Sequence, residues 1–137
     1  MFAGPRGGID GSDVNPDDIQ GSPDGLWIDD NGRMWIQTDG RQPDGSNNQM
    51  LMADPATREI KRFLVGPLDC EVTGVTMTPD SRTMFVNIQH PGDGGFGPDA
   101  GPSNPTQTST WPEGAAAARP RPATVVIQRT DGRIIGG

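Results

Sequence analysis

The chain has 137 residues, of which 31% are hydrophobic, 20 are glycine and 14 are proline, and its formal net charge is −7 at neutral pH. This composition is poor for an independent core and predicts long loops, while the negative charge argues against nucleic acid as a partner and suits divalent cations. A lone cysteine, Cys70, excludes an internal disulfide and a cysteine-rich metal cluster, and no apolar run is long enough to span a membrane.

Residues 1–22 hold turn signals without sustained periodicity and predict an irregular opening segment without the apolar core of an export signal. Residues 23–68 then predict four antiparallel strands joined by turns. The first hairpin is the clearest, because its Asn31-Gly32 pair tolerates the positive φ of a type I′ turn. The four expected strands cover residues 26–28, 34–38, 50–53 and 60–65.

Residues 69–137 predict a second unit of the same kind, interrupted by an insertion. The insertion covers about residues 89–122 and is dense in Gly, Pro, Ser and Thr. Loops of that length are usually functional lids or disordered segments. The expected strands cover residues 71–77, 83–88 and 123–129, with residues 133–135 completing the last hairpin.

The two units resemble each other. The segment from Gly25 to Gln37 precedes a similar segment that begins at Gly74 by about 49 positions. Short strands with such a period are typical of β-propeller blades. The sequence therefore predicts an all-β chain with about two four-stranded antiparallel blades of an incomplete β-propeller and long Gly/Pro-rich loops. Because propellers close with about four to eight blades, we expect this chain to be a piece of something larger.

Two acidic residues at strand starts are candidate metal ligands. Glu71 begins an expected innermost strand, where a carboxylate would point into the channel and offer oxygen to a hard cation. It could equally be a solvated carboxylate at a strand end. Asp24 occupies the corresponding place in the first repeat, although Pro-Asp-Gly is also an ordinary turn.

Asn87 and His90 lie at the end of the second strand of the second unit and are further candidates. Asn87 could add a metal ligand, and His90 could contact phosphate or a leaving group as an acid near neutral pH. His90 could instead shape the loop before Pro91. As the chain has one histidine, it cannot form a multi-histidine zinc site. Asp39 and Asn48 flank a polar loop and could supply oxygens on the same rim, but residues 37–40 equally fit a strand that runs into a turn, so both are interpreted as structural.

Other residues are assigned to the framework. Arg33 and Arg82 follow corresponding turns, so we expect both to stabilise the blades. Trp27, Trp35 and Phe85 are expected in the core between the blades. The chain contains no serine-nucleophile elbow and no Gly-Lys-Ser/Thr phosphate loop, which argues against a metal-free enzyme.

Several collinear blocks together resemble the C-terminal part of PhoX-type alkaline phosphatases. The blocks are Ser22-Pro23-Asp24-Gly25-Leu26-Trp27, Met34-Trp35-Ile36-Gln37-Thr38-Asp39-Gly40, Asn47-Asn48-Gln49-Met50, Cys70-Glu71-Val72-Thr73-Gly74, Phe85-Val86-Asn87-Ile88-Gln89-His90-Pro91-Gly92, Trp111-Pro112 and Arg119-Pro120-Arg121-Pro122-Ala123-Thr124-Val125-Val126. The resemblance implies a periplasmic or extracellular phosphomonoesterase on a β-propeller, with calcium and iron ions that hold the phosphate. It also implies that a glutamate in the block of Glu71 binds metal, and that the family's iron-binding cysteine lies upstream rather than at Cys70.

The expected function is thus phosphate monoester hydrolysis by a longer metal-dependent enzyme, with no activity for this chain alone. A first alternative is a non-catalytic propeller-derived module that associates with the missing blades or with copies of itself through exposed sheet edges. A second alternative is a calcium-dependent propeller similar to lactone hydrolases, which also begin blades with Pro-Asp-Gly.

Overall fold

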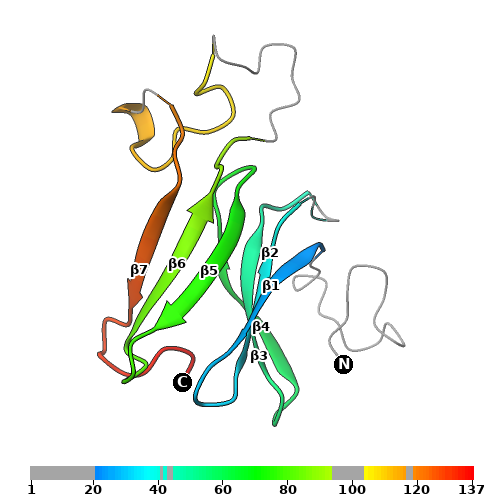
Figure 1. Ribbon diagram of the computed structural model, residues 1–137, viewed down its shortest axis with the longest axis vertical. Helices are drawn as coiled ribbons and strands as arrows, with labels where there is room; N and C mark the ends of the chain where they lie inside the picture. The colour runs from blue at the N-terminus through cyan, green and yellow to red at the C-terminus, as the bar shows by residue number, and fades with distance from the viewer. Residues whose placement is uncertain (1–20, 41, 43–44, 94–103, 117–118) are drawn as a thin grey trace.

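The computed structural model describes residues 21–40, 42, 45–93, 104–116 and 119–137 (Figure 1). The predicted opening segment lies almost entirely outside these ranges, as does part of the predicted insertion. In the described residues the helical structure is a single 3₁₀ turn, η2 (Gly114–Ala116). No helix there is long and apolar enough to cross a membrane.

The described strands form two antiparallel sheets, one after the other along the chain (Figure 1). The first sheet has the order β1-β2-β3-β4 and the second the order β5-β6-β7. The strands are β1 (Pro23–Ile28), β2 (Met34–Thr38), β3 (Gln49–Asp54), β4 (Glu59–Val65), β5 (Glu71–Met77), β6 (Thr83–Gln89) and β7 (Ala123–Gln128). The predicted all-β class with two antiparallel units is confirmed.

The second sheet differs from the prediction at its last strand, because residues 133–135 form no strand. Instead, the backbone N–H of Ile135 donates to the carbonyl of Ser81 at 2.9 Å, and the Ile135 side chain is buried in the core. The next residue, Gly136, lies against the side chains of Arg33 and Trp35. The apolar residues that suggested a strand therefore fill space between the sheets.

The first hairpin turns where the sequence predicts, but its turn is not type I′. That turn needs positive φ at both central residues, and only Gly32, at +78°, has it. The Gly32 N–H donates to the Asp29 carbonyl at 2.9 Å, and the Asp29 N–H donates to the Arg33 carbonyl at 3.0 Å. This pattern fits a three-residue loop that ends in a left-handed glycine.

The main core lies between the two sheets. Alternate residues of β6 point toward the first sheet, as the period of two requires. The face of the first sheet that they meet carries apolar residues of β2 and β3. The buried members are Trp35, Met50, Cys70, Val72, Met84, Val86, Ile88 and Ile135. Trp27 packs against this cluster as predicted, whereas Phe85 does not join it, because it occupies the opposite face of β6 from Met84 and Val86.

Candidate metal site

Three strand ends meet where the two sheets pack against each other. Asp39 directly follows β2, Glu71 is the first residue of β5, and His90 directly follows β6. Glu71 pairs with Gln89 in the antiparallel register of β5 and β6, which brings the start of one strand beside the end of the other. Because β5 also contacts β2 in the first sheet, Asp39 reaches the same place.

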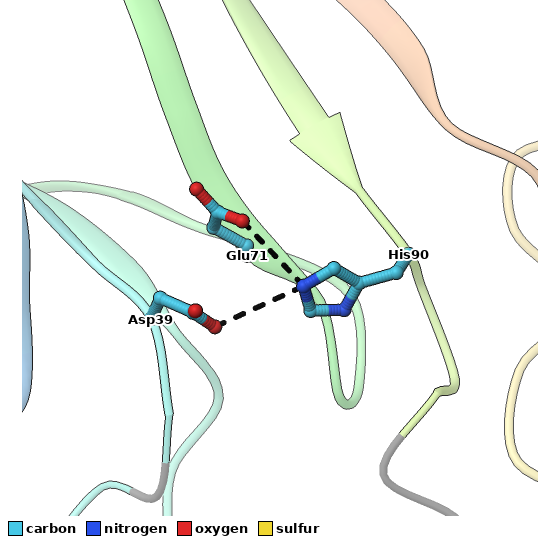
Figure 2. A group of neighbouring side chains, drawn as sticks. All are labelled: Asp39, Glu71 and His90. Atoms are coloured by element: carbon cyan, nitrogen blue, oxygen red, sulfur yellow. Dashed lines mark ion pairs between the residues drawn. The ribbon is translucent and has the colours of Figure 1, made fainter.

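The three side chains point toward one another (Figure 2). The Nε2 atom of His90 lies 3.5 Å from Oε2 of Glu71 and 3.9 Å from Oδ1 of Asp39. One ligand atom from each residue lies within 4.8 Å of the others. The Glu71 side chain is 12% exposed, His90 35% and Asp39 42%. The group is therefore anchored at Glu71 and open to solvent at Asp39.

A cavity of about 800 Å³ adjoins the open side of this group. Asp39 and His90 line it together with polar residues of the loop after β2, among them Gln42, Asn47 and Asn48. A small polar molecule thus has room to approach Asp39 and His90 without displacing the core.

His90 is held in an unusual backbone conformation. Its φ is +36°, in the left-handed region that residues with a Cβ rarely adopt. The Nδ1 atom is buried and has no hydrogen-bond partner among the described residues, so Nε2 is the ring nitrogen that faces the carboxylates. Backbone strain of this kind persists where the surroundings fix a side chain's direction, and it clusters at functional sites.

The structure brings two of the four predicted site residues, Glu71 and His90, into this group. Asp24 is exposed in an irregular part of β1, between Pro23 and Gly25. Asn87 is exposed on β6, and its Oδ1 accepts a hydrogen bond from Thr124 Oγ1 at 2.6 Å. Metal binding by Asp24 or Asn87 stays a prediction.

Sequence reasoning considered Asp39 as an oxygen donor but favoured a structural role, because residues 37–40 equally fit a strand that runs into a turn. The signal for Asp39 in the sequence was its position: it follows β2 in the first repeat, as His90 follows β6 in the second repeat. The contact between Asp39 and His90 depends on how the sheets pack, which a local pattern does not contain.

Cys70, next to Glu71, is buried in the core between the sheets. Burial, with a smaller contribution from the charges of Asp39, Asp69 and Glu71, raises the pKa of the Cys70 thiol to about 12. The protonated thiol therefore packs as an apolar residue of this core.

The donor set fits a hard or borderline cation. Two carboxylates offer the oxygen atoms that calcium prefers, and an imidazole nitrogen suits iron or zinc rather than calcium. Within the described residues, His90 is the one side-chain partner of both carboxylates, so their oxygens are available to an ion. Three donors do not fill the roughly six to eight positions of calcium.

The fold and this site define the chain as a propeller-type all-β protein with a candidate cation site where two sheets meet. The family model for alkaline phosphatase PhoX matches residues 1–92, a segment that includes Asp39, Glu71 and His90. The chain therefore belongs to the alkaline phosphatase PhoX family. A comparison with curated proteins gave no match.

A solved structure agrees with the family model. It is described as "Pseudomonas fluorescens PhoX in complex with vanadate, a transition state analogue". The two chains share 45% sequence identity with a TM-score of 0.76, and the match covers 96% of this chain. The match covers 22% of the Pseudomonas fluorescens chain, so this chain spans about a fifth of that protein's length.

Proposed function

We propose that this chain contributes one side of the metal and phosphate site of a PhoX-type phosphate monoesterase, through Glu71, Asp39 and His90. The observation that carries the proposal is the convergence of these residues on one point, within the segment that matches the family model. The match to a phosphatase family favours phosphate esters over lactones as substrates. The vanadate named for the Pseudomonas fluorescens protein, a transition state analogue there, agrees with chemistry at phosphorus.

Each residue has a separate role in this proposal. The nearly buried carboxylate of Glu71 is the anchor for a cation, and the more exposed Asp39 closes its open side. Calcium and iron, which the family resemblance implies, would neutralise phosphate charge when bound there. His90 turns Nε2 toward this space and can hold a phosphate oxygen or give a proton to the leaving oxygen.

Calcium binding measured by isothermal titration calorimetry tests the site. We expect the chain to bind Ca²⁺, and Glu71→Gln to lower the affinity at least tenfold, because an anchoring charge is lost. Glu59→Gln is the matched control, since Glu59 is exposed, forms an ion pair with Lys61 at 2.8 Å, and begins β4 opposite Asp54 at the end of β3. Equal effects of the two substitutions, or no calcium binding by the unchanged chain, would contradict the proposal.

Catalytic turnover by this chain alone is a separate question from cation binding. The described residues offer three donor atoms, which cannot enclose a metal cluster without ligands from elsewhere. We therefore expect this chain alone not to hydrolyse p-nitrophenyl phosphate, even with calcium and ferric iron supplied. Robust turnover that Glu71→Gln abolishes would overturn this expectation and would still support the site.

We further propose that the outer faces of the two sheets pack against other sheets of a PhoX-type protein, in the periplasm or outside the cell. Leu26 and Ile28 of β1 are 62% and 57% exposed, and Val126 of β7 is 60% exposed. Self-association through these faces is the alternative. Light scattering, which gives the molar mass in solution, distinguishes the two. Self-association through these faces would give assemblies that Val126→Lys and Leu26→Lys convert to monomers.

A further inference from the structure

The side chain of Asn48 connects the two strand ends that carry Asp39 and Glu71. Its Oδ1 accepts hydrogen bonds from Thr38 Oγ1 at 2.8 Å and from Gln42 Nε2 at 2.7 Å. Its Nδ2 donates to the backbone carbonyl of Cys70 at 2.6 Å. Thr38 directly precedes Asp39, and Cys70 directly precedes Glu71. One amide therefore spans from the end of β2 to the start of β5.

This connection is almost completely shielded from water. Asn48 is 7% exposed, Gln42 2%, and Thr38 and Cys70 are fully buried. The Thr38 hydroxyl is fixed further, because it accepts a hydrogen bond from the Gln49 N–H at 2.9 Å. Satisfied hydrogen bonds in a low-dielectric interior hold one arrangement strongly, because breaking any of them leaves a buried polar group without a partner.

The connection matters because β2 and β5 belong to different sheets. Strand pairing fixes Glu71 relative to Gln89, and so to His90, but it does not fix Asp39 relative to Glu71. We propose that Asn48 is a positioning residue for the cation site, which sets the separation of the Asp39 and Glu71 carboxylates. The inference rests on the proposed function, in which these carboxylates hold the ion.

Asn48→Asp separates positioning from simple charge. The substitution keeps the acceptor atom for Thr38 and Gln42, removes the donor to Cys70, and adds a negative charge near the site. Charge alone would tighten Ca²⁺ binding, whereas lost positioning weakens it. We expect a weakening of about tenfold or more, the usual loss when an outer-shell partner is removed.

Asn47→Asp is the matched control. Asn47 adjoins Asn48, lines the same cavity, and donates through Nδ2 to the Gly66 carbonyl at 2.9 Å rather than to a residue that directly precedes Asp39 or Glu71. The same charge change there should leave calcium affinity equal or higher. Should Asn48→Asp not fold, Thr38→Val removes the Asp39 half of the connection together with the acceptor of the Gln49 N–H, leaves the bond from Asn48 to Cys70, and is expected to weaken binding less, in the same direction.

A readout without metal keeps this inference separate from the proposed function. In the metal-free chain, nuclear Overhauser contacts between the His90 ring protons and the Asp39 methylene report the arrangement directly. We expect these contacts in the unchanged chain and in Asn47→Asp, and their loss in Asn48→Asp and Thr38→Val. Contacts retained in both variants would overturn the positioning role. If the unchanged chain binds no Ca²⁺, the proposed function fails and these contacts alone decide the role of Asn48.

Discussion

The two ends of the sheets use carboxylates in opposite ways. At the first hairpin turn, Asp29 is buried and accepts four hydrogen bonds, from the N–H groups of Asn31 and Arg33, from Arg33 Nε and from Trp35 Nε1, at 2.8–3.0 Å. At the other end, Glu71 and Asp39 meet His90 alone among the described residues. A carboxylate that the protein already satisfies holds the fold together, and one that it leaves open is available to a ligand.

The difference extends to proton affinity. Burial on its own would raise the pKa of Asp29, but the hydrogen bonds from Trp35 and Arg33 and the charge of Arg33 outweigh burial and lower that pKa below its ordinary value of 3.8. The folded protein therefore takes up a proton at Asp29 less readily than the unfolded chain does. At pH values above the ordinary pKa of 3.8, the Asp29 carboxylate stabilises the folded protein. This contribution is lost as the pH falls toward the lowered pKa of the folded state.

The largest effect that this comparison predicts is on the stability of Asp29→Asn. Removing the charge leaves the guanidinium of Arg33 buried without its partner, which costs about 3–5 kcal/mol of unfolding free energy. Urea unfolding followed by tryptophan fluorescence measures it. Asp80→Asn is the control, because Asp80 lies in the corresponding turn of the second sheet but is exposed. A loss for Asp29→Asn no larger than for Asp80→Asn would break the comparison.

A second, smaller effect is the acid dependence of stability. Below pH 3.8 the unchanged chain should lose stability steadily, since protonation of Asp29 breaks its bonds to Arg33 and Trp35. In Asp29→Asn this part of the curve should be flatter, because the group no longer titrates. Unfolding free energies at several pH values between about 2 and 5 provide the measurement. Parallel curves for the two proteins would show that Asp29 carries no such linkage.

The smallest expected effect is on the stability of Glu71→Gln. The one side-chain contact that the Glu71 carboxylate loses among the described residues is with His90, at 3.5 Å, and removing its charge relieves repulsion from Asp39. We expect a change in unfolding free energy of about 1 kcal/mol or less, alongside the large loss of calcium affinity proposed above. A stability loss as large as that of Asp29→Asn would show that Glu71 stabilises the fold, and would count against its role in a cation site.

Much of the fold followed from the sequence, because the repeat and its turn residues are local signals. The strands around Trp35 and Val86 were predicted from alternation and from the turns beside them. Residues 133–135 were not, since apolar residues at a chain end pair or pack according to what space the sheets leave. Phe85 was misplaced because alternation names two faces of a strand without saying which one meets the other sheet.

The site was predicted in part for the same reason. Glu71 and His90 could be named because each lies at the end of a strand in one sheet, where pairing brings them together. Asp39 and Asn48 adjoin strands of the other sheet, and the roles proposed for them depend on the packing between sheets. Local sequence patterns indicate which residues lie at the ends of strands, whereas the packing of the sheets decides which strand ends come together.

The most direct test of the cation site is anomalous diffraction from crystals of this chain grown with terbium ions, which bind oxygen ligands as calcium does. We predict a strong anomalous peak between the carboxylates of Asp39 and Glu71, lost in crystals of Glu71→Gln. A peak elsewhere, for instance beside Asp24 or beside Asn87, or no peak at the meeting of the sheets, would contradict the account.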